Sequence, residues 1–293
     1  MAPAADQSAF ADPDLELSDR ELQTITRLVY EKSGITLGDA KRPLVVARLQ
    51  KRLRAGRFAS FAAYLQHVDA DPSGDELTAL LDAIATNHTS FFRESQHFDF
   101  LADQVVPEWL GRGDGAPLTG WSAPCSTGEE PYSVAIWLLE NWPLVDRYEI
   151  EIVGSDIDTD VLETARIGLY GKRALMRLAP DLVSRYFVAK EFENWQILDD
   201  LRNSVQFTRV NVVDPSETRP HGRFDVIFCR NVLIYFDDAS RRLAAENLYE
   251  NLAPGGYICL GHAESMSRIS PLFDVRRFDD AIVYQRPAEE SHG

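Results

Sequence analysis

Seven short β-type runs constrain the fold of the second half of this chain more than any other feature. They occupy residues 118–123, 148–156, 204–211, 224–231, 256–261, 273–278 and 281–286. Four of the first five are separated by segments long enough for a crossover helix, which is typical of a parallel, doubly wound α/β sheet. The final two runs lie close together and predict an antiparallel hairpin. Dehydrogenase-type sheets do not normally end in such a hairpin, so the pattern argues against that class.

The first part of the chain has a different pattern. Residues 15–85 show apolar spacings of three to four residues, and Ser18 and Asp75 lie near expected helix starts. These features predict a small all-α domain at the N-terminus. The polar chain ends, residues 1–16 and 286–293, are expected to be loosely ordered.

The remaining segments complete the predicted organisation. Residues 86–116 are expected to form a linker that contributes to the ligand site, and residues 117–287 are expected to form the sheet domain. Within that domain, residues 168–202 are longer than one crossover helix requires. We therefore expect a small inserted subdomain on the rim of the sheet.

A basic stretch stands out in an otherwise acidic chain. Residues 41–57 contain seven Lys or Arg residues and no Asp or Glu. On a helix, three of the cations share one face: Lys41, Arg48 and Arg52. Three apolar side chains share another: Val46, Leu49 and Leu53. Two interpretations stay open, a solvated surface or a docking face for an acidic partner.

Composition argues against several classes of protein. Thirty basic against 46 acidic residues give a net charge of −16, which repels polyanions and disfavours nucleic acid as the main partner. Cys125, Cys229 and Cys259 are far apart, and the six histidines lack zinc-type spacing, so buried thiols and no metal site are expected. The chain start lacks the features of a signal peptide, and no apolar run approaches the roughly 18 to 20 residues of a membrane span. A cytoplasmic location without direct membrane insertion follows as an expectation.

The end of the first β-type run carries two acids. The stretch WSAPCSTGEEPYS, residues 121–133, is rich in small residues that let a ligand approach the backbone, and Glu129 and Glu130 follow where a helix begins. A phosphate-binding loop has more glycines and a Lys, and two acids repel phosphate. The acids suit a cationic or amine-bearing ligand, although a plain strand-to-helix turn remains the alternative.

The second run ends at Asp156. An acid at this place in a doubly wound sheet accepts hydrogen bonds from ribose hydroxyls. Taken with the acidic first loop, Asp156 indicates a nucleoside that carries positive charge rather than a pyrophosphate. S-adenosylmethionine has both properties.

Five motifs resemble, in the same order, those of the chemotaxis receptor glutamate methyltransferases, the CheR family. They are TNHTSFFRE (86–94), WSAPCSTGEEPYSVA (121–135), GSDIDTDVLETAR (154–166), FDVIFCRNVLIYFD (224–237) and LAPGGYICLGHAESM (252–266). The resemblance covers residues 18–286. It implies an N-terminal helical domain, a class I methyltransferase domain, and transfer of a methyl group from S-adenosylmethionine to receptor glutamates, with S-adenosylhomocysteine as the product. Taken alone, TNHTSFFRE could be a helix start with two Phe in the core.

The resemblance also implies roles for individual residues. Its cofactor-binding positions are Asn87, Thr89, Arg93, Ala123, Glu129, Asp156, Asn211, Val212, Asn231 and Val232. Glu129 corresponds to the acid that faces the methionine amine, Asp156 to the ribose acceptor, and Asn211 with Val212 to the adenine contacts. Pro124 and Cys125 stand where the family often has small residues, which changes the loop without removing a polar role.

Arg93 and Tyr235 are the predicted catalytic residues, because they correspond to the methyl-transfer end of the family's site. A glutamate carboxylate with a pKa near 4.3 is already ionised at neutral pH, so the reaction needs no general base. We expect Arg93 and Tyr235 to orient that carboxylate, with placement supplying most of the rate.

The resemblance implies one partner and leaves alternatives. The partner is the acidic helical bundle of a chemoreceptor, met by Lys41, Arg48 and Arg52. The protein is expected to be a monomer, and tethering to a receptor tail pentapeptide is not expected, because the segment after Phe187 is short. A non-catalytic S-adenosylmethionine-binding module and a methyltransferase for nucleic acid or a small molecule are the alternatives. A DNA amino-methyltransferase has [DN]-P-P-[YF] after its fourth strand, where this chain has RNVLIY, and a dehydrogenase has GxGxxG, which is missing after the first strand.

Overall fold

The structure, a computed structural model, describes residues 16–278 and 280–288. We expect the two chain ends to be loosely ordered, and most of their residues, 1–15 and 289–293, lie outside the described range. The chain forms one compact unit that runs to Lys32 and from Thr36 to Ala85, and another that comprises Ser33–Ile35 and the residues from Thr86 onward.

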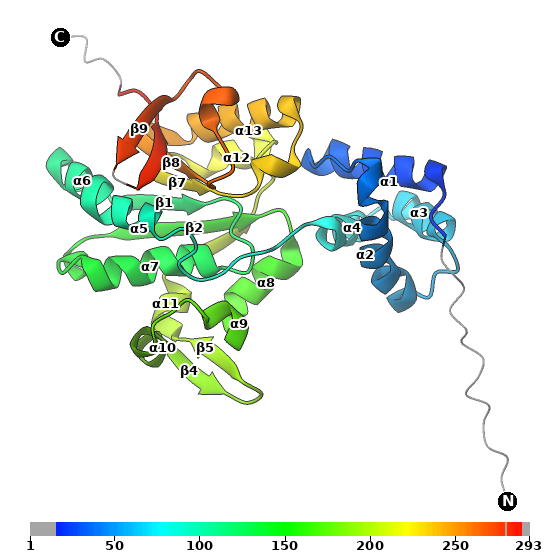
Figure 1. Ribbon diagram of the computed structural model, residues 1–293, viewed down its shortest axis with the longest axis horizontal. Helices are drawn as coiled ribbons and strands as arrows, with labels where there is room; N and C mark the ends of the chain where they lie inside the picture. The colour runs from blue at the N-terminus through cyan, green and yellow to red at the C-terminus, as the bar shows by residue number, and fades with distance from the viewer. Residues whose placement is uncertain (1–15, 279, 289–293) are drawn as a thin grey trace, which may run out of the picture. The chain divides into compact units, whose positions relative to one another are not determined.

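The first unit is all helical (Figure 1, blue to cyan). Its elements are α1 (Asp19–Ser33), η1 (Asp39–Lys41), α2 (Arg42–Ala55), α3 (Phe61–Ala70) and α4 (Asp75–Ile84). Ser18 and Glu21 form a capping box, because the Ser18 amide donates to the Glu21 carboxylate at 2.8 Å while the Glu21 amide donates to Ser18 Oγ. The prediction of helix starts near Ser18 and Asp75 is confirmed.

The basic stretch lies on α2, but its faces differ from the prediction. The buried apolar residues are Val45, Leu49 and Leu53, so Val45 and not Val46 belongs to the core face. Arg52 forms a bidentate pair with Glu76 at 2.7 and 2.6 Å, and Arg48 donates to the backbone carbonyls of Ile84 and Ala85 at the end of α4. The prediction of a separate basic face is therefore wrong for Arg48 and Arg52, because these two side chains bind residues of α4 and its C-terminal end.

Lys41 also has a local role. It is the last residue of η1 and precedes α2, and its Nζ donates to the Thr36 carbonyl at 3.0 Å. The exposed cations of the helix are Lys51 and Arg54, and Arg57 follows just after its end. The acidic partner of Arg52, Glu76, is 24 positions away in the chain, so no spacing rule for one helix identifies it.

The second unit is built on a mixed sheet. Within the described residues this sheet has seven strands in the order β6-β2-β1-β7-β8-β10-β9. The strands are β1 (Leu118–Ser122), β2 (Ile150–Asp156), β6 (Val205–Arg209), β7 (Phe224–Cys229), β8 (Leu252–Leu260), β9 (Asp274–Phe278) and β10 (Ala281–Gln285). The first five pair in parallel, and β10 pairs antiparallel with both β8 and β9. The predicted α/β sheet with a terminal hairpin is confirmed.

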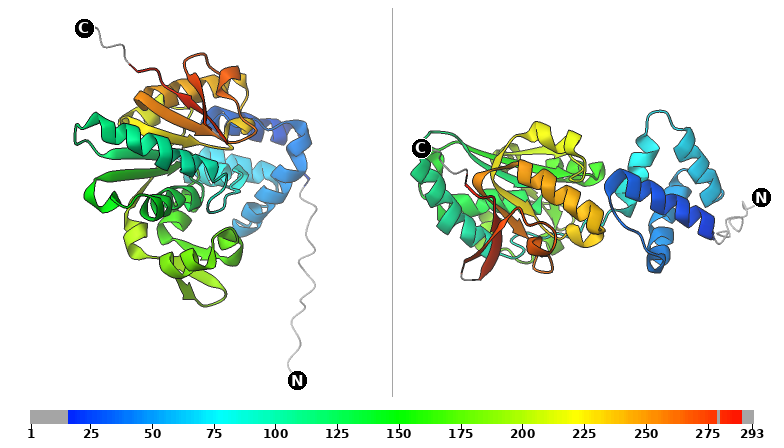
Figure 2. Two further views of the ribbon diagram at one scale, coloured as in Figure 1. Left: turned by 60° about the vertical axis from the view of Figure 1, so that its left-hand side comes forward. Right: turned by 90° about the horizontal axis from the view of Figure 1, so that it is seen from above.

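Helices cover both faces of this sheet, as Figures 1 and 2 show. One face packs against α5 (Gln96–Phe100), the π-helical turn η2 (Leu101–Val105), α6 (Val106–Arg112) and α7 (Glu129–Asn141), and the other packs against α13 (Asp238–Glu250). The strand β7 is buried along its whole length, with Val226 and Phe228 in the first core and Ile227 and Cys229 in the second. A continuous apolar run is what a strand buried on both faces requires.

An inserted subdomain projects from the rim of the sheet domain (Figure 1). After α8 (Thr159–Ile167) the chain forms β3 (Leu169–Gly171), α9 (Lys172–Leu175), α10 (Pro180–Tyr186), β4 (Phe187–Lys190) and β5 (Asn194–Ile197), and α11 (Asp199–Asn203) leads back to β6. Among the described residues the small sheet has the order β3-β5-β4. The prediction of a small subdomain at this point in the chain is confirmed.

The described residues bear on two further expectations from composition. None of the helices formed by these residues has the length and hydropathy of a membrane span. The same residues contain no group of three or more His, Cys, Asp or Glu side chains that could hold a metal ion. Cys125, Cys229 and Cys259 are all free and buried, as predicted.

Candidate functional site

The predicted site residues come together at one edge of the main sheet. Strands β1, β2, β6 and β7 are parallel neighbours, so their carboxyl ends meet there. Ala123, Asp156, Asn211 and Asn231 each lie at or just beyond one of these ends. In doubly wound sheets this edge is where ligands bind.

Asp156 is a buried acid at this edge. Its residue is 4% exposed, and its carboxylate accepts the Ser126 amide at 2.8 Å and the Asp158 amide at 3.0 Å. Burial raises the pKa of Asp156 to about 6, against the opposing effect of these hydrogen bonds. Two carboxylate oxygens have about four acceptor positions, so Asp156 can accept a further hydrogen bond from a ligand.

The loop after β1 is shaped by close packing. Ala123 is fully buried and its amide donates to the Phe228 carbonyl at 2.9 Å, and the Ala123-Pro124 peptide bond is cis. Gly128 has φ +90°, and a Cβ there would lie 2.9 Å from Ala165 Cβ, so only glycine fits. The loop therefore brings its backbone close to the end of β2.

Glu129 is the first residue of α7 and is 4% exposed. Its carboxylate accepts the Thr127 hydroxyl at 2.6 Å, and burial raises its pKa. Because the charged form of a buried carboxyl is disfavoured by desolvation, a cationic group beside it would be stabilising. The environment of Glu129 is compatible with an ammonium ligand, which stays a prediction.

The segment TNHTSFFRE is not a helix start. Residues 85–90 have no regular structure, residues 91–95 form turns, and the next helix is α5. Phe91 is fully buried and its ring packs edge-on against Tyr170 and Phe187. Phe92 and Glu94 have φ of +49° and +54°, which is uncommon for residues with a side chain. The segment is an irregular linker whose conformation is fixed by tertiary contacts.

Three polar residues of this linker are predicted to belong to the site, and one of them, Asn87, contacts the residues that follow β2. Asn87 Nδ2 donates to Asp158 Oδ2 at 2.5 Å, two residues beyond Asp156. Arg93 donates to the His88 carbonyl at 2.9 Å, and its side chain is 27% exposed. Thr89 is partly buried. Asn87 is thus joined to the end of β2, as expected for a linker that contributes to the site.

A buried ion network holds the linker in place. Arg230, directly after β7, has a side chain only 2% exposed, and its guanidinium contacts Glu130 at 2.8 Å and Glu94 at 3.5 Å. It also donates to the Arg93 backbone carbonyl. Ser122 Oγ donates to Glu130 at 2.7 Å.

We did not predict this network from the sequence. The one signal for it is an arginine that directly follows the apolar residues 226–229. Such a residue is almost never fully buried unless it is paired.

The remaining predicted residues follow β6 and β7. Val212 accepts a hydrogen bond from Asn247 at 2.9 Å through its carbonyl, and the Asn211 amide donates to Glu217 at 2.8 Å. Asn231 has φ +61°, and Tyr235 ends the short 3-10 helix η5 (Leu233–Tyr235). The three predicted docking residues, Lys41, Arg48 and Arg52, belong to the other unit and are not part of this site.

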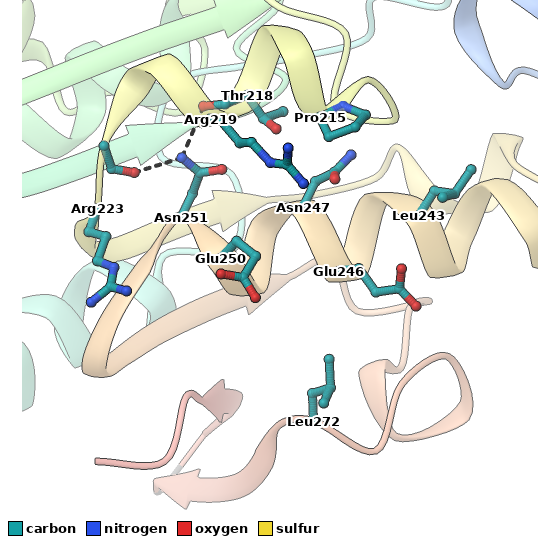
Figure 3. A pocket seen from close by; sticks show the side chains of 11 residues that line it. Pro215, Thr218, Arg219, Arg223, Leu243, Glu246, Asn247, Glu250, Asn251 and Leu272 are labelled. Carbon is teal, nitrogen blue, oxygen red and sulfur yellow. Dashed lines mark hydrogen bonds between the residues drawn. The ribbon is translucent and has the colours of Figure 1, made fainter. Parts of the chain in front are cut away.

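A hollow of the sheet domain, separate from the candidate site, contains none of the predicted residues (Figure 3). Its volume is about 800 Å³, and it lies between α12 (Pro215–Thr218) and α13. Its floor is held by Asn251, which donates to the carbonyls of Thr218 and Gly222 at 3.0 and 2.6 Å. Arg219 and Glu250 are among its charged residues. Because Gly222 and Asn251 precede β7 and β8, this part of the hollow lies at the amino ends of these strands, opposite the candidate site.

Comparison with known proteins agrees with this geometry. The family described as "CheR methyltransferase, SAM binding domain" matches residues 87–282, and "CheR methyltransferase, all-alpha domain" matches residues 20–85. Chemotaxis protein methyltransferase 2 of Vibrio cholerae is 40% identical over 94% of this chain and 95% of its own length. The chemotaxis protein methyltransferases of Salmonella typhimurium and Escherichia coli are 38% and 37% identical, each over 89% of this chain and over 89% and 90% of their own lengths. The chain belongs to the CheR methyltransferase family.

Proposed function

We propose that this protein transfers the methyl group of S-adenosylmethionine to glutamate side chains of chemoreceptors and so forms glutamate methyl esters. The observation that carries the proposal is a pair of buried carboxylates in a member of this family: Glu129 at the start of α7, which follows β1, and Asp156 at the end of the neighbouring strand β2. The action takes place in the cytoplasm, and the other product is S-adenosylhomocysteine.

The residues at the sheet edge fit this cofactor. Asp156 would accept the two ribose hydroxyls, and Glu129 would pair with the methionine ammonium, a contact that offsets the desolvation of the carboxylate. Ala123 begins the loop that leads from β1 to Glu129, and its backbone would also face the cofactor. Asn211 and Val212 would contact the adenine, and Asn87, Thr89, Asn231 and Val232 would complete the site.

Little chemistry is required of the protein beyond placement. S-adenosylmethionine supplies an electrophilic methyl group on a sulfonium. A substrate glutamate is ionised at neutral pH, so no protein base has to remove a proton. Arg93 and Tyr235 would hold the substrate carboxylate in line with the methyl group, and this orientation accounts for most of the rate. Arg93 can do this because a guanidinium binds a carboxylate through two parallel hydrogen bonds.

A labelling experiment tests the proposal. The purified protein is incubated with methyl-labelled S-adenosylmethionine and membranes that contain chemoreceptors, and the receptors are then treated with mild base. Carboxyl methyl esters are base-labile, so the expected result is label on the receptor that base releases. Label that survives base, or label on nucleic acid, would contradict the proposed substrate.

We further propose that α2 guides the receptor to the site through its exposed cations. Lys51 and Arg54 are the exposed cations of α2, and their exposure makes them the candidates for contact with an acidic helical bundle. The Lys51→Glu, Arg54→Glu double variant is expected to raise KM for the receptor about fivefold or more, because two attractive contacts become repulsive. Steady-state kinetics with receptor-containing membranes measures the change, and kcat and S-adenosylhomocysteine affinity should stay at wild-type values.

Two controls sharpen this prediction. The same charge change at Arg219 and Arg242, which are exposed in the sheet domain, should leave KM unchanged. Added salt should reduce the difference between the variant and the wild type, since exposed charges are screened over about 8 to 10 Å at physiological ionic strength. An isolated receptor C-terminal peptide is expected not to bind strongly. Micromolar binding of that peptide, together with an unchanged KM for the double variant, would assign recruitment to the rim subdomain instead.

A further inference from the structure

The chain between β7 and α13 has an irregular backbone conformation. This β7 loop, defined here as residues 230–236, carries Asn231, Val232 and Tyr235. Asn231 is left-handed, with φ +61°. Such a conformation in a residue with a side chain is sparsely populated and persists when surrounding contacts fix it. The contacts that fix the β7 loop therefore decide where Tyr235 lies.

The side chain of Glu264 makes these contacts. Glu264 lies between β8 and the short helix η6 (Met266–Arg268). Its Oε2 accepts the Asn231 amide at 2.7 Å and the Gly261 amide at 2.9 Å, while Oε1 accepts the Ile234 amide at 3.3 Å. One carboxylate thus joins the left-handed residue to η5, whose last residue is Tyr235. Hydrogen bonds between backbone amides and a carboxylate are charge-assisted, and so are stronger than neutral ones.

A second contact also fixes the position of the β7 loop. The Asn231 side chain lies directly over Gly261, where a Cβ would come within 2.3 Å of Asn231 Nδ2. The β7 loop therefore rests on the backbone that follows β8. Both contacts come from residues 261–264, and both act on Asn231.

We infer that Glu264 is a positioning residue for methyl transfer, acting through the β7 loop on Tyr235 without contacting the reacting atoms itself. The inference rests on the proposed function. The carboxylate is required because both of its oxygens face backbone N–H groups. In a Glu264→Gln variant, either orientation of the amide places an NH2 donor against an N–H of the loop.

The expected effect is on turnover. A displacement of about 1 Å in a reacting geometry can lower a rate about a hundredfold, so Glu264→Gln should reduce kcat roughly 10- to 100-fold. The affinity for S-adenosylhomocysteine should fall less than kcat, because Asn231 and Val232 belong to the proposed cofactor site while Asp156 and Glu129 lie on β2 and α7, away from the β7 loop. Steady-state kinetics and calorimetry give the two quantities. Glu140→Gln is the matched control, since the Glu140 carboxylate also accepts hydrogen bonds at both oxygens, from Arg185 and Tyr186, but lies near the end of α7 away from the site.

A double-mutant cycle separates positioning from general stability. If Glu264 acts through Tyr235, the loss of kcat in the Glu264→Gln, Tyr235→Phe protein is smaller than the product of the two single losses. Multiplicative losses would overturn the inference, as would an unchanged kcat in Glu264→Gln while the wild type is active. An inactive wild type would instead contradict the proposed function.

Amide hydrogen exchange provides a readout that does not depend on activity. The Asn231 and Ile234 amides should exchange at least about tenfold faster in Glu264→Gln than in the wild type, while the amides of β1 and β2 keep their rates. Glu264→Asp, which keeps the charge but shortens the reach, should show a smaller increase at Ile234 and serves if the Gln variant does not fold. Equal exchange at both amides in wild type and variant would overturn the inference.

Discussion

The Asp156→Ala variant is expected to bind S-adenosylhomocysteine roughly 30- to 140-fold more weakly than the wild type, which corresponds to about 2 to 3 kcal/mol. Two hydrogen bonds from ribose hydroxyls to a buried carboxylate would be lost. The variant also releases the Ser126 and Asp158 amides, which the carboxylate accepts at 2.8 and 3.0 Å. Isothermal titration calorimetry measures the change.

The pH dependence of binding distinguishes the ribose contact from a general disturbance of the loops. The pKa of Asp156 in the free protein is raised to about 6 by burial, so the carboxylate is ionised above pH 6 and takes up a proton as the pH falls through that value. The ionised form is the one that accepts two hydroxyls. At pH 5 the dissociation constant should therefore be about tenfold higher than at pH 7.5, and in Asp156→Asn this step should disappear.

A matched aspartate serves as the control. Asp225 is also buried and accepts the Thr119 amide at 2.9 Å, but it lies near the amino end of β7, at the opposite edge of the sheet. Asp225→Asn should keep wild-type affinity for S-adenosylhomocysteine at pH 7.5. If Asp156→Ala binds as tightly as the wild type, Asp156 is not the ribose acceptor.

The fold of the sheet domain could be predicted because its signals are local. The run FDVIFC is apolar at nearly every position, and β7 is buried on both faces, so length and composition alone identify a central strand. The two closely spaced runs at the end leave no room for a crossover, and they pair as the antiparallel strands β9 and β10. Asp156 could be placed because the end of a strand fixes which edge of the sheet it reaches.

The basic helix shows where such reasoning fails. A helical wheel groups residues by angle, and a rotation of about 100° per residue separates Val45 from Val46. A helical wheel also does not show which neighbouring helix each face contacts. Arg52 lies beside the core face and reaches Glu76 on α4, a partner that only the packing of α2 on α4 brings near.

The buried ion network could not be predicted for a related reason. Arg230 is 100 positions away from Glu130 in the chain, and its contact with Glu94 spans a still longer separation. These groups meet because the linker crosses the ends of β1 and β7. The left-handed residues Phe92 and Glu94 are likewise set by tertiary contacts, such as the hydrogen bond from the Phe92 amide to Ser133 Oγ at 3.0 Å. The conformational preferences of individual residues therefore do not predict such contacts.

Arg93→Ala is expected to lower kcat about a hundredfold or more, because removing one donor that stabilises the reacting group typically has this effect. The backbone of the linker should keep its place, since Arg230 donates to the Arg93 carbonyl and not to its side chain. Affinity for S-adenosylhomocysteine should therefore change much less than turnover. Tyr235→Phe should show the same pattern with a smaller loss, because the ring remains and only the hydroxyl is removed. Single-turnover kinetics and calorimetry measure the two quantities.

The control for Arg93 is Arg166, whose guanidinium also donates to a backbone carbonyl, that of Phe207, at 3.0 Å. Arg166→Ala removes a comparable side chain and a comparable hydrogen bond from α8, so it should turn over at the wild-type rate. If Arg93→Ala instead keeps wild-type turnover at saturating cofactor and loses cofactor affinity, Arg93 binds the cofactor carboxylate and Tyr235 alone orients the substrate. A loss of both in equal measure would mean that Arg93 supports the conformation of the linker, since its side chain also donates to the His88 carbonyl.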